Sequence, residues 1–327
     1  MPPPGPPVSL FGEIVLPVFV LIAVGFVAAR RGLLGGEGVR ALSDAAFLIF
    51  MPALLFGAIA RVDFHRLTPG AALAYYAVGL PLFAAVLLLQ AMRGRGAATA
   101  TIHALGSVFG NTVMLGIPVV RLAYGETGLA FLLTIIAWHA LVFLSLGTLV
   151  FETSLIDRRP GAERSWRTLG AHLLQVARSA LIHPVVLPIL AGLAWSAMHW
   201  PLPVPLDRAL AMLGAAATPL CLVLLGASLA QFELRAGLAT AAGLTAVKSV
   251  LFPLLVWSAG NWLLRLEPLP LAVATVTAAL PTGANVYLFA QRYRTQVGET
   301  SATVALSTLA AALALPWLLY RLPTAAL

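Results

Sequence analysis

The chain has 327 residues, of which 60% are hydrophobic and only 10% are charged, and its mean hydropathy is +0.95. A soluble domain carries about 25% charged residues, so the composition excludes an ordinary soluble protein and indicates a polytopic membrane protein. The net charge of +8 comes mainly from arginines in short polar stretches between apolar runs. Arginines there are topology signals at a membrane surface, so nucleic acid is not expected as a partner. The single Cys221 excludes an internal disulfide and a cysteine-based metal site.

Apolar runs separated by charged or Pro/Gly-rich breaks predict ten transmembrane helices, each of about 20 residues or slightly more. The fold class that we predict is therefore an all-α integral membrane protein. The longest polar stretch, residues 152–170, divides the chain into five spans within 1–151 and five within 171–327. The predicted spans lie near residues 10–30, 40–60, 69–92, 98–121, 126–151, 171–198, 207–231, 236–264, 268–291 and 298–320.

The arginines predict the orientation of these spans. Thirteen arginines lie at the loops after the odd-numbered spans, and six lie on the opposite side. Because basic residues concentrate in cytoplasmic loops, this asymmetry places residues 152–170 in the cytoplasm and both termini outside.

The two halves of the chain share landmarks in the same order, which predicts an internal repeat. The offsets between paired positions are 167 to 174 residues, and the pairs are Pro17 with Pro184, Pro52 with Pro219, Pro81 with Pro253, Asn111 with Asn285, and Gly125-Glu126-Thr127 with Gly298-Glu299-Thr300. Because each half has an odd number of spans, the second half is inserted upside down relative to the first. Inverted repeats are the plan of many secondary transporters, in which the substrate site lies near the bilayer midplane.

Two apolar segments contain residues that break helices. Residues 106–118 hold three glycines, an Asn-Thr pair and a proline, and residues 280–285 read Leu-Pro-Thr-Gly-Ala-Asn. Non-helical backbone at membrane depth is tolerated where it is buried in protein or lines a cavity. A helix that restarts there directs unpaired N–H groups and the positive end of its dipole toward an anionic ligand. The candidate substrate-binding residues are therefore Gly110, Asn111, Thr112, Pro118, Pro281, Thr282, Gly283 and Asn285.

Three ionisable residues within predicted spans are further candidates. Lys248, the single lysine, lies mid-span, where insertion costs about 2.5–3.5 kcal/mol. It is interpreted as a counter-charge for a carboxylate substrate, a proton-linked switch or a substitute for a bound cation, or alternatively as a donor to carbonyls at the broken helices. Asp44 lies one turn inside its span, where snorkelling to the interface is favoured over pairing or proton coupling. His139 is interpreted as forming a hydrogen bond between helices in preference to carrying protons.

The motifs resemble those of the auxin efflux carrier family, which includes the plant PIN carriers and bacterial members associated with malonate or malate. The resemblance rests on Gly-Asn-Thr-Val-Met-Leu-Gly-Ile-Pro from Gly110, on Lys248 followed by Pro253, and on Ala-Leu-Pro-Thr-Gly-Ala-Asn-Val-Tyr from Ala279. It implies two inverted five-helix repeats, similar to the bile acid:sodium symporter fold, with broken helices 4 and 9 crossing. It also implies an elevator-like movement, with Asn111, Pro118, Pro281 and Asn285 as crossover positions.

The predicted function is a secondary transporter of small organic carboxylates in the bacterial inner membrane, with no cofactor. A sodium-coupled organic anion symporter is one alternative, although deep acidic residues are scarce. A non-transporting membrane sensor on the same scaffold is another. An intramembrane enzyme is disfavoured, because the sequence has no G-x-S-x-G, no H-E-x-x-H and no spaced acidic pair in adjacent spans. Substrate identity, direction and coupling ion stay open, and so does the oligomeric state, with a homodimer as one arrangement.

Overall fold

The structure is a computed structural model that describes residues 16–61, 68–156, 184–231 and 237–322. Regular structure in these ranges is helical, apart from one antiparallel bridge between Gly110 and Thr282. Parts of the predicted organisation lie outside the described ranges: the start of the first span, residues 157–170 of the central loop, and residues 171–183 of the sixth span.

Six helices among the described residues are long and apolar enough to cross a membrane: Gly36–Ala60, Gly70–Met92, Thr112–Phe151, Val204–Leu229, Leu238–Leu263 and Val297–Arg321. Shorter apolar helices are α2 (Leu16–Arg30), α9 (Val186–Ala197) and α13 (Pro268–Ala279). This architecture agrees with the predicted all-α membrane protein.

Helix α7 (Ile117–Ile156) contains the end of the fourth predicted span and all of the fifth. Gly125, with φ of 64°, interrupts its helical geometry between them. A positive φ is accessible to glycine without steric cost, so Gly125 permits the change of direction that the predicted boundary requires. The helix ends at Ile156, five residues beyond the predicted end of the span.

Prolines explain three of the π-helical turns in the described segments. The turns η2 (Ala46–Phe50), η4 (Thr112–Gly116) and η5 (Val247–Leu251) each end two residues before a proline, at Pro52, Pro118 and Pro253. Proline has no N–H to donate, so it removes one bond from the helical ladder. In each case the residue before the proline donates to the carbonyl five residues earlier, and the helix continues with one wider turn.

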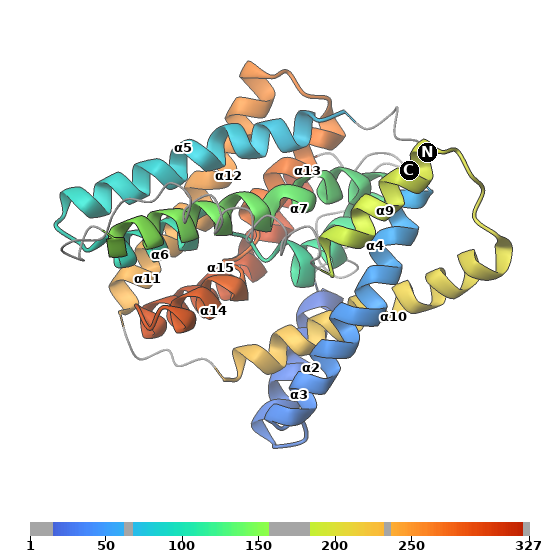
Figure 1. The fold of residues 1–327 in the computed structure, drawn as a ribbon, viewed down its shortest axis with the longest axis horizontal. Coiled ribbons are helices and arrows are strands. Elements are labelled where there is room, and N and C mark those ends of the chain that lie inside the picture. Colours follow the sequence, from blue (N-terminus) through green and yellow to red (C-terminus); the bar gives the residue numbers. More distant parts are fainter. Residues whose placement is uncertain (1–15, 62–67, 157–183, 232–236, 323–327) are drawn as a thin grey trace.

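The helices form two groups (Figure 1). One contains α2, α3 (Gly36–Ala45), α4 (Met51–Ala60), α9 and α10 (Val204–Leu229), which pack on one another. At the other side lie α5 (Gly70–Met92), α6 (Ala97–Val108), α11 (Leu238–Ala246), α12 (Phe252–Ser258) and α14 (Ala284–Arg292), with α7, α13 and α15 (Val297–Arg321) toward the middle. A further π-helical turn, η6 (Ala259–Leu263), follows α12.

Glycines let α2 and α10 approach each other through their backbones. A Cβ added to Gly25 would lie 1.9 Å from the carbonyl oxygen of Val223, and one added to Gly226 would lie 1.8 Å from that of Ile22. Small residues allow this close approach in membranes, where helix association depends on van der Waals packing. The α2–α10 contact is therefore set by shape.

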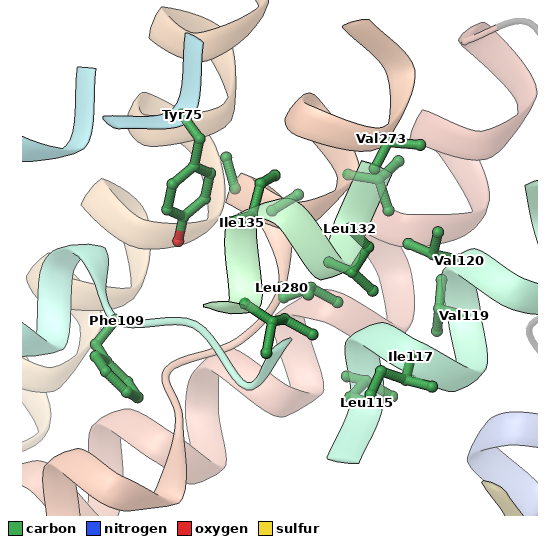
Figure 2. Close-up of a cluster of buried hydrophobic side chains, with 14 of the residues drawn as sticks. Tyr75, Phe109, Leu115, Ile117, Val119, Val120, Leu132, Ile135, Val273 and Leu280 are labelled. Atoms are coloured by element: carbon green, nitrogen blue, oxygen red, sulfur yellow. The ribbon is translucent and has the colours of Figure 1, made fainter. Parts of the chain in front are cut away.

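A buried apolar core surrounds the place where the two interrupted segments meet (Figure 2). Leu280 is fully buried, and a Cβ added to Gly116 would lie 2.7 Å from its Cδ1 atom. Leu132 and Ile135 of α7 and Val273 of α13 are also fully buried nearby. This packing fixes the positions of the extended segments.

Candidate functional site

The two segments with helix-breaking residues contact each other directly. Helix α6 ends at Val108 and helical structure resumes at Thr112, while α13 ends at Ala279 and α14 begins at Ala284. The extended residues between them exchange backbone hydrogen bonds: Asn111 N–H donates to Pro281 O at 2.8 Å, and Gly283 N–H donates to Phe109 O at 2.9 Å. We refer to residues 109–111 and 280–283 together as the crossover.

Side chains from other helices satisfy the backbone at one face of the crossover. The Thr282 hydroxyl donates to Gly106 O at 2.8 Å, and the Thr282 N–H donates to the Ser307 hydroxyl at 3.0 Å. The Tyr75 hydroxyl donates to Val108 O at 3.2 Å. The last carbonyls of a helix have no partner within it, so these donors stabilise the break in α6. This face of the crossover is closed and packed.

Lys248 belongs to the same packed face. Its side chain is fully buried, its ammonium donates to Ala278 O at 2.5 Å, and it lies 5.2 Å from the centre of the Phe252 ring. It is not among the residues that line the cavity described below. This geometry matches the interpretation of Lys248 as a donor to a carbonyl at a broken helix, because Ala278 is in the last turn of α13.

The opposite face of the crossover opens onto a cavity of about 380 Å³. Its wall is mainly apolar with a few polar groups, as is usual for small-molecule sites. The lining residues described by the structure are Ser43, Asp44, Phe47, Leu48, Phe109, Gly110, Asn111, Thr112, Val113, Met114, Ile136, His139, Pro184, Val185, Val186, Gly283, Ala284 and Asn285. None of them is a lysine or an arginine.

Asn111 carries an unused donor into this cavity. Its side chain is only 6% exposed, and its Nδ2 atom has no hydrogen-bond partner. Two helices begin at the same wall, one at Thr112 and the other at Ala284. The first N–H groups of a helix lack partners within it, so the wall presents the positive ends of two helix dipoles together with a free amide. These groups favour an anionic group of a ligand.

His139 is part of this wall and is held in place by its neighbours. Its Nε2 atom accepts a hydrogen bond from Gly110 N–H at 3.2 Å. Its ring lies 4.3 Å from the ring of Phe109 and 5.4 Å from that of Phe143, centre to centre. The side chain therefore acts as a hydrogen-bond acceptor that holds the extended segment in place.

The structure thus brings together seven of the predicted site residues at one cavity. These are Asp44, Gly110, Asn111, Thr112, His139, Gly283 and Asn285. Pro281 and Thr282 lie in the crossover but do not line the cavity. The Pro281 carbonyl accepts from Asn111 N–H, and the Thr282 side chain is on the packed face. Pro118 lies beyond the end of η4. Asn285 is exposed, whereas its partner in the repeat, Asn111, is buried.

Sequence reasoning missed most of the apolar wall. Phe47, Met114, Ile136 and Val185 line the cavity, but apolar side chains within spans carry no signal that separates a cavity wall from lipid-facing or core positions. Among the described residues, no group of three or more His, Cys, Asp or Glu side chains could hold a metal ion.

Comparison with known sequences assigns the family. The sequence profile of a family described as membrane transport protein matches residues 10–319. The chain belongs to this family. The predicted relationship to auxin efflux carriers is confirmed, and the protein is a multi-pass membrane transporter and not an enzyme.

Three relatives span nearly the whole chain. A Rhizobium meliloti protein named "Putative malonate transporter" is 28% identical over 319 residues, covering 96% of both chains. A Methanothermobacter thermautotrophicus protein named "Uncharacterized transporter" is 24% identical, covering 93% of this chain and 96% of its own. Auxin efflux carrier component 8 of Arabidopsis thaliana is 24% identical, covering 85% of this chain and 88% of its own.

Proposed function

We propose that this protein is a secondary transporter that carries small organic carboxylates across the bacterial inner membrane, with the substrate bound at the cavity face of the crossover. The observation that carries the proposal is the unpartnered, buried amide of Asn111, which lies in a cavity where two helices begin. A carboxylate would accept hydrogen bonds from this amide and from the N–H groups of Thr112 and Ala284. No buried positive side chain is needed to compensate its charge.

The names of two relatives support the carboxylate class. One is named for malonate and another for auxin, and both compounds carry a carboxylate. The cavity has no lysine or arginine among its described lining residues, so a carboxylate would rely on helix N-termini and amides. The same wall is mainly apolar, which suits the carbon skeleton of an organic acid better than an inorganic anion.

The proposed mechanism is alternating access by an elevator-like movement. We infer ten spans in two inverted repeats, residues 1–151 and 171–327, joined by a cytoplasmic loop at 152–170, with both termini outside. The α2, α3, α4, α9 and α10 group would be the static scaffold, and the helices around the crossover would move. The repeat landmarks and the two helix groups in Figure 1 support this division. A homodimer through the scaffold is consistent with it.

The position of Lys248 supports the hypothesis that transport does not depend on sodium. Its ammonium contacts Ala278 O near the end of α13, and a backbone carbonyl of this kind is the ligand that a bound cation would need. A positive charge built into the chain at this position would take the role of the ion. Protons or the gradient of the substrate would then drive transport.

Uptake into proteoliposomes tests the proposal. We expect saturable uptake of at least one of malonate, malate, pyruvate and indole-3-acetate by the wild type. We expect Asn111→Ala to reduce this uptake at least about tenfold, the loss of one hydrogen bond to a charged group, without lowering the unfolding temperature. The matched control is Asn261→Ala, because Asn261 is in η6 and does not line the cavity. Equal uptake by Asn111→Ala and the wild type would contradict a site at the crossover.

A further inference from the structure

Asp44 places a carboxylate in the cavity that the proposed function assigns to an anion. It is in the last turn of α3 and lines the same cavity as Asn111, Thr112 and Ala284. It is exposed, and no ion pair to it exists in the part of the chain that the structure describes. A carboxylate substrate therefore shares its cavity with an acid that has no ion-pair partner among the described residues, and like charges in one cavity repel each other.

No described cation forms an ion pair with Asp44. Helix α3 itself carries the exposed Arg40 one turn before Asp44 and the exposed Glu37 two turns before it. The packed helix α10 carries Asp207 and Arg208 at its first turn, where Asp207 pairs with Arg61, together with the thiol of Cys221. Helix α9 carries no titratable side chain, and α14 carries Tyr287 and Arg292, of which only Tyr287 has a described side chain. In the cavity wall the other titratable group is His139, whose Nε2 atom is held by Gly110.

The cavity wall thus carries two chemically different sets of groups. One set consists of donors: the Asn111 amide and the N–H groups at Thr112 and Ala284. The other set includes an acceptor with negative charge, Asp44, beside Ser43, whose hydroxyl already donates to Val39 O at 2.7 Å. A ligand that satisfies both sets carries an ionised carboxylate and a separate hydrogen-bond donor.

We propose that Asp44 makes this carrier select the singly protonated form of a dicarboxylate, an inference that rests on the proposed function. The ionised carboxylate of the substrate lies against the helix N-termini and Asn111, and its protonated carboxyl group donates a hydrogen bond to the ionised Asp44. The proton arrives on the substrate's own carboxyl group and leaves with it, and no covalent bond of the substrate changes. Each transport event therefore moves one dicarboxylate, one proton and a net charge of −1.

The test is the pH dependence of KM for malonate in proteoliposomes, compared with that for the monocarboxylate propionate. Above the second ionisation of malonate, the singly protonated fraction falls tenfold for each pH unit. Wild-type KM for total malonate should therefore rise about tenfold for each pH unit up to about pH 8, while KM for propionate stays constant. In Asp44→Asn the amide can donate to a doubly ionised malonate. In this variant KM for total malonate should therefore increase by less than about threefold for each pH unit.

Two variants control for charge and for folding. Glu37→Gln removes an exposed acid of the same helix that does not line the cavity, and it should keep the wild-type pH dependence. Asp44→Glu keeps the negative charge, and it should also keep the wild-type pH dependence of KM. Propionate uptake by Asp44→Asn shows that the variant is folded and inserted.

Two results would overturn the inference while leaving the proposed function intact: a wild-type KM for malonate that does not change with pH, or the same pH dependence in Asp44→Asn as in the wild type. The first of these results needs no variant, so it would overturn the inference even where Asp44→Asn does not fold; in that case the pH dependence in Asp44→Glu tests the role of the residue. Absence of uptake of every carboxylate by the wild type would instead overturn both the proposed function and the inference.

Discussion

The α2–α10 contact and the crossover are both close approaches of backbone to backbone, but they are stabilised by different forces. Gly25 and Gly226 let two regular helices meet, with each glycine against a carbonyl of the other helix. At the crossover, extended chain meets extended chain, and paired N–H and C=O groups stabilise the contact. Regular helices satisfy their own backbone, so shape alone can join them. Interrupted helices must find partners elsewhere, and donors left without one become available to a ligand.

The largest loss of stability is expected from a substitution at the glycine contact between α2 and α10. Gly226→Ala would place a Cβ 1.8 Å from Ile22 O, and because the clash is with backbone, no side-chain rotation relieves it. We expect a loss of about 3 kcal/mol in stability, measured as a fall in the thermal unfolding midpoint and in the monodisperse yield in detergent. Gly243→Ala is the matched control, because a Cβ there meets nothing within 4 Å. Similar stability of the two variants would show that α2 and α10 can separate without cost.

A smaller effect is expected at the packed face of the crossover. Lys248→Met keeps the length and apolar stem of the side chain but leaves Ala278 O without its donor, which should cost about 1–2 kcal/mol of stability. Ser249→Ala is the control, because the Ser249 hydroxyl is buried without a partner. Thermal unfolding and uptake kinetics should be measured together. A large rise in KM with unchanged stability would instead identify Lys248 as a counter-charge of the substrate.

The smallest effect is expected at the exposed ion pair of the α4–α10 contact. Arg61 and Asp207 approach to 2.7 Å, but their side chains are 41% and 42% exposed. Exposed pairs contribute little because water and salt screen them, so Arg61→Gln should lower stability by about 0.5 kcal/mol or less. Arg208→Gln removes the same charge without this pair and serves as the control. A loss as large as that of Gly226→Ala would show that charge, and not shape, stabilises this group of helices.

Local chemistry in the sequence was sufficient to place the two helix interruptions. Gly110 and Asn111 lie between α6 and η4, and Pro281 and Gly283 lie between α13 and α14, because glycine, asparagine and proline have low helix propensity and here occur close together. Matching positions in the two halves also indicated that the interruptions belong together. The membrane class followed from composition, which no tertiary contact can change.

The partners of individual polar groups could not be predicted in the same way. Lys248 was recognisable as costly in a span, but its contact with Ala278 O depends on how η5 packs against α13. Asp44 was interpreted mainly as a residue that reaches the membrane surface; it is exposed, and it also lines the cavity. Both outcomes depend on the distance between elements far apart in the chain, and a single sequence does not encode that distance in any local pattern.

The two hydrogen bonds that join the crossover connect Asn111 N–H with Pro281 O and Gly283 N–H with Phe109 O. All four atoms belong to the main chain, so these two bonds do not depend on the identity of side chains that have no contact with the crossover. Wall residues outside the crossover and its supporting contacts can therefore be replaced while the crossing persists. Main-chain joining of this kind places few demands on sequence, in line with the identities of only 24% and 28% to relatives that are named for different compounds.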